Sequence, residues 1–452
     1  MGKVKNTDKK MDMLHGPLLK KIILFALPIA ASSILQQMFN SADTAVVGRF
    51  AGSLSLAAVG GTSMVVSMLI TLFTGISVGA NAVIAHCIGE GRNDKIQEVV
   101  HTVITLALVC GALMLCIGQF IARPILILMD TPADVLDLAV LYLRIFFIGM
   151  PFFMIYNFGS AILRSVADTK RPMYALIISG IVNVLLNLLF VIKFRMGVSG
   201  VATATVISNG VSSLLVLHFL RHGDERIRVN LKKLRIVKSH ISRVLAIGIP
   251  AGLQGMVFAV SNIFVQTGVN SFGSSAVAGS SAAASLELFS YFVVLAFAQA
   301  AVTFAGQNYG AGLYERCRKV FRLTMLSGVV AAGMVSLILT VGSSFFLSIF
   351  TTDSEALYYA GIRVFRTGSF IFIVASFEIT SGVMRGMGRS LLPSVLTILG
   401  SCVLRVLWVY TVFRHFRTFD VLLDVYLITW IITGIMVLTA YNLMLRKTKR
   451  QI

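Results

Sequence analysis

One carboxylate with amide neighbours interrupts an apolar stretch near the start of the chain. Asp43 follows Gln36 and Asn40 at the far end of an apolar run that begins near Ile22. An Asp at the centre of a membrane helix costs roughly 2.5 to 3.5 kcal/mol, so such acids are usually functional and face a bundle interior or a wet cavity. We therefore expect Asp43 to be functional and the rest of the chain to build a cavity around it.

Later apolar segments carry further polar side chains. Asn183 and Asn187 are four residues apart and therefore share one helix face. Other amide and hydroxyl groups that we expect to extend the cluster are Asn40, Tyr156, Asn157, Thr205, Ser208 and Asn209. One carboxylate with several such oxygens suits a proton, because a low dielectric favours the neutral acid, or Na⁺, for which Asp43 would be the metal ligand. The alternative for the asparagines is hydrogen bonding between helices, worth about 0.6 kcal/mol each.

A second set of charges lies in the later half of the chain. Glu287 falls well inside its apolar run, Glu378 lies nearer the end of its own, and Arg405 is embedded in a third. Unpaired charges at such depth are costly, so we expect Arg405 to pair with one of the two acids. The alternative is an ion pair that only fixes packing. Candidate substrate-binding residues are Gln36, Tyr156, Asn157, Glu287, Glu378 and Arg405.

The composition defines the class of protein that holds these residues. Of 452 residues, 57% are hydrophobic and 13% charged, and the mean hydropathy is +0.87. A soluble domain cannot bury so large an apolar fraction, so the sequence predicts an integral membrane protein. The net charge of +20 lies mainly in short segments between apolar runs, which indicates membrane topology and not nucleic-acid binding. The five cysteines lack the spacing of a metal site, and the Lys-rich start predicts a retained first helix.

Twelve apolar runs are long enough to span a bilayer. They cover residues 20–44, 54–82, 97–120, 135–160, 172–194, 199–220, 241–269, 277–306, 318–346, 357–383, 393–413 and 421–444. The odd-numbered loops hold few basic residues, namely Arg49, Arg123, Lys193, Arg195, Arg414 and Arg417, whereas most others fall in the even-numbered loops and at the ends. By the positive-inside rule both termini are expected in the cytoplasm, for a multi-pass protein of the plasma (inner) membrane.

The chain also repeats itself. A shift by roughly half its length aligns Pro28 with Pro250, Asn40 with Asn262, Arg144 with Arg363, Arg164 with Arg385 and Pro172 with Pro393. Six spans per half give both halves the same topology. The predicted fold is an all-α membrane protein of twelve helices in two pseudo-symmetric six-helix lobes around a central cleft. The lobes are expected at residues 1–220 and 244–452.

The segment 221–243 between the lobes is expected to be a basic cytoplasmic linker. Ile227, Leu231 and Leu234 fall at helical spacing, so part of it is either an amphipathic interfacial helix or a solvated strand of chain. Pro28 and Pro250 each remove a backbone hydrogen bond from equivalent helices, which predicts a hinge or a fixed kink at both.

The repeat also shows that polarity is unequal between the halves. The counterpart of Asp43 is Val265, and the counterparts of Asn183 and Asn187 are Leu404 and Trp408. The first half therefore carries an acid and amides that the second lacks, which strengthens the prediction of a site there. Flat, greasy cations would find adaptable apolar contacts in the Met side chains of the cleft helices, namely Met38, Met64, Met68 and Met256.

These features together resemble the multidrug and toxic compound extrusion (MATE) transporters of bacterial type. The motifs that carry the resemblance are Pro28 with residues 36–48, then 151–172, 183–187, 200–205, 303–312 and 382–388. The resemblance implies two lobes, a V-shaped cleft and efflux driven by H⁺ or Na⁺ antiport. It places Asp43 on the first-helix acid of the family. Asn187 stands where many members carry a second carboxylate, and the seventh span has no acid, so the chain departs from the family at both positions.

The expected function is therefore an antiporter, not an enzyme, that exports organic cations in exchange for H⁺ or Na⁺ by alternating access. Its only cofactor would be the coupling ion, its partners small organic substrates and the lipid bilayer, and its state a monomer. The alternative is a lipid-linked oligosaccharide flippase of the same superfamily, which would need a cationic cavity for a pyrophosphate. Arg405 is the main residue that favours this alternative. An intramembrane enzyme would need a catalytic constellation, and a channel would need a repeated pore loop, neither of which is evident.

Overall fold

The protein is built from helices that run along one common direction. The computed structural model describes residues 11–449, and no strand occurs in that range. Eleven of the helices it describes are long and apolar enough to cross a membrane, and a bent pair, α4 with α5, adds a twelfth span. The prediction of an all-α membrane protein with twelve spans is confirmed.

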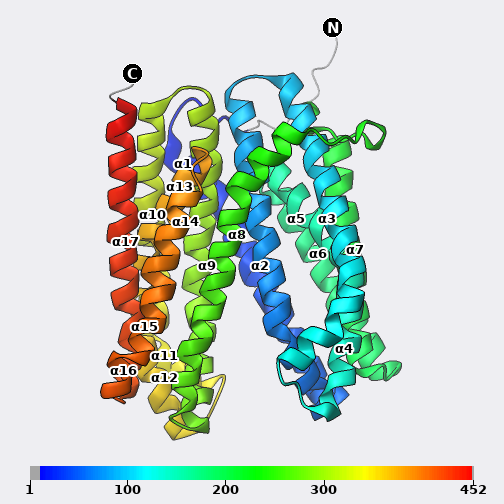
Figure 1. Cartoon of the computed structure of the whole chain (residues 1–452), viewed down its shortest axis with the longest axis vertical. Helices are drawn as coiled ribbons and strands as arrows, with labels where there is room; N and C mark the ends of the chain where they lie inside the picture. Colours follow the sequence, from blue (N-terminus) through cyan, green and yellow to red (C-terminus); the bar gives the residue numbers. More distant parts are fainter. Residues whose placement is uncertain (1–10, 450–452) are drawn as a thin grey trace.

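The first lobe holds the first six spans (Figure 1). Its helices are α1 (Leu18–Val46), α2 (Ser53–Gly89), α3 (Asn93–Leu128), α4 (Ala133–Ile148), α5 (Met150–Ser165), α6 (Lys170–Asn187) and α7 (Gly197–His222). Short π-helical turns, Val47–Ala51 and Leu188–Lys193, extend α1 and α6. The fourth span, predicted as one run, bends by 47° between α4 and α5, because Pro151 in the first turn of α5 has no backbone N–H for a continuous helix.

The second lobe repeats this plan with more interruptions. Its helices are α8 (Lys238–Asn270), α9 (Ser274–Gly310), α10 (Tyr314–Val341), α11 (Ser343–Ser348), α12 (Ser354–Arg366), α13 (Ala375–Gly386), α14 (Leu391–Thr397), α15 (Leu404–Tyr410), α16 (Val412–His415) and α17 (Phe419–Lys449). A 3₁₀ segment, Gly368–Val374, joins α12 to α13, and a π-helical turn, Ile398–Val403, joins α14 to α15. These joints keep α12–α13 and α14–α15 as single spans.

Helices α1 and α8 cross from one lobe to the other. The first half of α1 packs in the core of the second lobe, where Phe25 meets Phe304 edge-on at 5.6 Å. The last turns of α1 instead pack against α6 of the first lobe. In α8 the early residues Val244 and Ile247 belong to the core of the first lobe. Pro28 lies inside the part of α1 that packs in the second lobe, between the core residues Ala26 and Ala30, and it removes one backbone hydrogen bond from the helix there.

The lobes touch at the end where α1 begins and α17 ends (Figure 1). There α2 is buried almost continuously from Phe73 to Ile88, whereas its earlier turns are mostly exposed. The contact is close because a Cβ added at Gly75 would overlap the backbone of Gly252, so the two helices meet at glycine. The ribbons of the two lobes diverge toward the opposite end (Figure 1).

Between α7 and α8 the linker forms no α-helix, so of the two alternatives the amphipathic interfacial helix is wrong. It holds two 3₁₀ turns, Glu225–Ile227 and Leu231–Lys233. Asp224 and Asn230 each accept a hydrogen bond from a backbone N–H two residues on, which closes a short turn in place of a helix. The linker is nevertheless held in place, because Ile227 is fully buried in the core of the first lobe.

Candidate functional site

Asp43 forms a polar cluster with asparagines from a neighbouring helix. Asn187, the last residue of α6, donates from Nδ2 to Oδ1 of Asp43 at 2.5 Å. The same amide nitrogen lies 3.3 Å from Oδ1 of Asn183, and Asn183 Nδ2 lies 3.4 Å from the hydroxyl of Ser208 on α7. Three helices of the first lobe, α1, α6 and α7, therefore hold one continuous chain of polar groups.

The cluster contains more acceptors than donors. Asn187 is fully buried and Asp43 half-buried. Oδ1 of Asn187 has no hydrogen-bond partner among the residues that the structure describes, although a buried amide oxygen normally has one. Within residues 11–449 no Lys, Arg or His forms an ion pair with Asp43. The cluster therefore combines a carboxylate that has no basic partner among the described residues with a buried amide oxygen that has no donor.

The remaining predicted members of the cluster lie near it but do not contact the carboxylate. Asn40 is exposed, and only its backbone carbonyl is engaged, by the hydroxyl of Thr44. Thr205 is half-buried and donates to the carbonyl of Val201 in its own helix. Gln36 is also exposed, one turn before Asn40 on the same face of α1.

Tyr156 and Asn157 belong to a different part of the first lobe. Asn157 donates to the carbonyl of Phe153 in its own helix, and Tyr156 packs against the hydrophobic core. The structure does not bring either into contact with Asp43. The tyrosine that lies within electrostatic range of Asp43 is Tyr142 on α4, which sequence reasoning missed. The only feature of the sequence that could have indicated Tyr142 is its position as a tyrosine inside a predicted span.

In the second lobe, Glu287 is paired with an arginine that the sequence did not nominate. Arg363 donates from Nε and Nη2 to the two carboxylate oxygens at 3.0 and 2.9 Å, and from Nη1 to the hydroxyl of Ser280. Thr367 also donates to Glu287. The expectation that Arg405 pairs with Glu287 or Glu378 is wrong. The internal repeat aligns Arg363 with Arg144 but does not predict which acid Arg363 pairs with, because that depends on how α9 and α12 face each other.

Glu378 lies in a second buried chain of polar groups. Arg385 donates to Oε1 of Gln254 at 2.7 Å, and Nε2 of Gln254 lies 3.5 Å from Oε1 of Glu378. All three side chains are buried, and they tie α8 to α13. Gln254, whose amide bridges an acid and a base, was not predicted.

Arg405 stands apart from both acids. Its Nη1 donates to Oδ1 of Asn262 at 2.6 Å, and its guanidinium lies over the rings of Phe258 and Tyr426 at 4.9 and 4.6 Å. Its side chain is 0% exposed. Glu287 is thus paired with Arg363, whereas neither Glu378 nor Arg405 forms an ion pair with a described residue.

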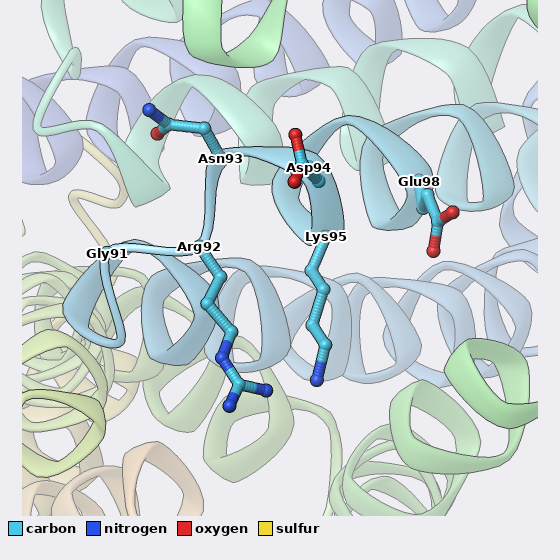
Figure 2. Close-up of a pocket in the computed structure, with 6 residues that line it drawn as sticks. All are labelled: Gly91, Arg92, Asn93, Asp94, Lys95 and Glu98. Atoms are coloured by element: carbon cyan, nitrogen blue, oxygen red, sulfur yellow. The ribbon is translucent and has the colours of Figure 1, made fainter.

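A separate hollow lies at the turn between α2 and α3 (Figure 2). It is lined by Gly91, Arg92, Asn93, Asp94, Lys95 and Glu98. This turn stands at the closed end of the molecule, whereas Asp43 is near the opposite end of α1. The hollow mixes acidic and basic side chains on an open surface, so it is not part of the candidate site. No group of three or more His, Cys, Asp or Glu suited to a metal occurs in the part of the chain that the structure describes.

Comparison with known proteins identifies the family. The family model MatE matches residues 28–189 and again residues 250–411. A probable multidrug resistance protein of Bacillus subtilis is 29% identical over 389 residues, which cover 84% of this chain and 83% of that protein. An FAD transporter of Shewanella oneidensis is 24% identical over 78% of each chain. A solved structure described as an outward-facing multidrug resistance MATE family transporter has a TM-score of 0.90 at 22% identity and covers 99% of this chain and 100% of that one.

The two matches fall one in each lobe, so they also reproduce the internal repeat. Together they cover well over half of the chain. The chain therefore belongs to the MatE family of multidrug and toxic compound extrusion transporters, which are membrane transporters and not enzymes.

Proposed function

We propose that the protein exports organic compounds from the cell in exchange for an inward-moving H⁺ or Na⁺ that binds at Asp43. The observation that carries this proposal is the contact between Asp43 and Asn187. Among residues 11–449, the half-buried carboxylate has no basic partner, and the buried amide oxygen beside it has no hydrogen-bond donor. Binding of one cation supplies the missing positive charge and satisfies these oxygens. Asp43 is then the metal ligand if the ion is Na⁺, and no other cofactor is required.

The distribution of basic residues supports an orientation in the membrane. The end at which the lobes touch carries the loops with Arg92, Lys95, Lys170 and Arg171, as well as the basic linker. Under the positive-inside rule this end faces the cytoplasm of a bacterial cell, so both termini are cytoplasmic and the protein lies in the plasma membrane. The predicted central cleft then opens to the outside, and Asp43 is reached from there.

Alternating access follows from this orientation. In the present arrangement the lobes are packed at the cytoplasmic end, so a cation enters Asp43 from outside while a substrate leaves. Release of the cation toward the cytoplasm requires the opposite arrangement, for which α1 and α8 bend at Pro28 and Pro250. A membrane potential contributes about 2.3 kcal/mol per charge per 100 mV, which is enough to bias such a two-state equilibrium.

The names of relatives support export of organic compounds but do not agree on one substrate class, since they include multidrug resistance proteins and an FAD transporter. They give no support to the flippase alternative. The expectation of cationic substrates rested on Glu287 and Glu378, which are engaged by Arg363 and by Gln254. Gln36 and the other exposed polar groups of α1 remain candidates for contact with the substrate while it is released. The carrier is proposed to act as a monomer.

The test is transport in proteoliposomes with pH and Na⁺ gradients imposed separately. Wild-type protein should accumulate ethidium against its gradient under one of the two ionic gradients, and Asp43→Asn should lose at least tenfold in initial rate while keeping its elution profile. Asp137→Asn is the matched control, because it makes the same change at an exposed acid of this lobe that pairs with Arg123, and it should keep the wild-type rate. Undiminished gradient-driven transport by Asp43→Asn would overturn the assignment.

A further inference from the structure

Arg405 is a buried cation whose charge is not balanced by its surroundings. It is fully buried where α15 packs against α8 and α17. No Asp or Glu among the described residues forms an ion pair with it, and its Nη1 contacts the neutral side chains of Asn262 and Ser261. A charge at this depth of a membrane protein is normally paired, so an unbalanced guanidinium requires an explanation.

The Arg405 nitrogens that lack a hydrogen-bond partner among the described residues form one edge of the guanidinium. Nη1 is engaged by Asn262, but Nε and Nη2 are buried and have no hydrogen-bond partner among the described residues. Nε and Nη2 make up the fork that binds a carboxylate with two parallel hydrogen bonds. Arg363 in the same lobe uses these same two atoms to hold both oxygens of Glu287. Of these two arginines, Arg363 has its fork filled by a carboxylate, whereas the fork of Arg405 meets no acceptor among the described residues.

Two aromatic rings lie against the guanidinium of Arg405. Phe258 and Tyr426 are 4.9 and 4.6 Å from the guanidinium carbon, and the hydroxyl of Ser261 lies 3.5 Å from Nη1, so the Nε–Nη2 edge is the part without a polar contact. Phe258 and Asn262 belong to α8, one of the helices that lead from the end where the lobes touch to the end where they diverge, and both are half-buried. A ligand that fits such a site has an acidic group attached to a flat or apolar body.

The internal repeat relates this site to the cluster around Asp43. Asp43 lies among α1, α6 and α7, and Arg405 lies among α8, α15 and α17, which hold the corresponding positions in the second lobe. Asn40 and Asn262 are counterparts, yet only Asn262 contacts the charged residue of its lobe. The two lobes thus present opposite charges at equivalent places.

We propose that Arg405 binds the acidic group, a carboxylate, sulfonate or phosphate monoester, of an organic substrate that the protein exports. The inference deepens the proposed function, because it assumes that the bound anion is the exported compound. It assigns the cation to the first lobe and an anionic group of the substrate to the second. The same chemistry is offered by the headgroup of an anionic lipid, so the test must separate these two sources.

The experiment compares two probes of equal shape, 2-naphthoate and the neutral 2-naphthamide. Binding of each to the full-length protein is measured by calorimetry in nanodiscs of phosphatidylcholine. Because two charge-assisted hydrogen bonds are gained, naphthoate should bind about tenfold or more tightly than naphthamide. This comparison needs no variant, so it tests the proposal even if changes at Arg405 prevent folding. Equal affinities for the two probes would overturn it.

Variants then locate the preference. Arg405→Gln should abolish it, and Arg405→Lys should retain only part of it, because a lysine keeps the charge but lacks the fork. The matched control is Arg366→Gln, which removes a guanidinium of the same lobe that is paired with Asp420 and Asp424 near the surface. Arg366→Gln should leave the preference intact. A preference that persists in Arg405→Gln would place the anion elsewhere and overturn the proposal.

Two further arms separate the sources and the two proposals. In nanodiscs of phosphatidylglycerol the naphthoate preference should persist; its loss there alone would assign the site to a lipid headgroup and overturn the substrate assignment. Asp43→Asn, which is expected to block transport, should leave the preference unchanged. Failure of the transport prediction and failure of the anion site are therefore read from different measurements.

Discussion

Asn81 of α2 donates from Nδ2 to the hydroxyl of Thr303 on α9 at 2.9 Å, and the two residues occupy equivalent places in the two matched halves of the chain. The bond therefore lies where the two lobes face each other about their pseudo-symmetry axis. Both side chains are fully buried, and Gln307 adds a second link between the lobes by donating to the carbonyl of Ser165. These contacts join the lobes at the end where α1 begins, and under the proposed alternating access they must break.

Loss of the Asn81 bond should shift the equilibrium between the two arrangements of the lobes. Asn81→Ala removes one hydrogen bond of about 1 kcal/mol that exists only in the closed arrangement, so the opposite arrangement should gain roughly fivefold in population. Spin labels at the exposed Asn93 and Arg389, in a cysteine-free background, report the distance between the lobes at this end by double electron–electron resonance. Thr62→Val is the control, because Thr62 is buried in α2 and bonds only within its helix. An unchanged distance distribution in Asn81→Ala would contradict the prediction.

The glycines of α2 should divide sharply by position. A methyl group at Gly75 would overlap the backbone of Gly252, whereas one at Gly61 meets open space. Gly75→Ala should lower the apparent melting temperature in detergent through about 1 to 3 kcal/mol of overpacking, and Gly61→Ala should be neutral or slightly stabilising. Equal melting temperatures for the two variants would show that the lobes separate at this contact without cost.

The sequence predicted the first-lobe cluster better than the charges of the second lobe, for a physical reason. Asn183 and Asn187 share a face by helical spacing alone, and Asp43 had to be near some polar group because a membrane helix does not tolerate an isolated acid. The structure brings these three side chains together. Their role in ion coupling stays a prediction.

The partners of Glu287 and Arg405 depended on information that spacing does not contain. Glu287 and Arg363 are 76 residues apart, and whether they meet depends on the rotation of α9 and α12 about their axes. Arg405 was assigned to an acid on the cost of burial, but the aromatic faces of Phe258 and Tyr426 and the amide of Asn262 surround it instead. The count of helices and the repeat follow from local hydrophobicity, whereas the pairing of charges follows from packing.

The Arg363–Glu287 pair should behave as a unit. Arg363→Gln leaves Glu287 as an uncompensated buried charge, which costs about 3 to 5 kcal/mol, so yield and thermal stability should fall steeply. The double variant Glu287→Gln with Arg363→Gln removes both charges and should recover most of the loss. Thermal melts of the single and double variants in the same detergent give the coupling energy. A double variant as unstable as Arg363→Gln alone would show that the arginine acts mainly through Ser280 or its contact with Tyr426.

Met13, which precedes the first helix, should contribute to the core of the second lobe. Its side chain is 1% exposed, and its carbonyl accepts from Asn308 and Arg316. Met13→Ala should therefore destabilise the protein by about 2 to 4 kcal/mol, as for other buried methionines. Leu14→Ala is the neighbouring control, because Leu14 is only half-buried. Equal melting temperatures of the two variants would mean that this segment does not support the lobe in solution.

Asn187→Asp should change the proton dependence of transport. The new carboxylate would stand where the amide now lies 2.5 Å from Asp43, and two carboxylates at that distance cannot both be ionised, so the pair must hold a proton between them. Substrate exchange across proteoliposomes at equal pH on both sides should then titrate in two steps, against one step in the wild type. Asn183→Asp is the matched control, because Asn183 is one turn away and does not contact Asp43. A wild-type pH profile in Asn187→Asp would show that the two side chains separate when the transporter works.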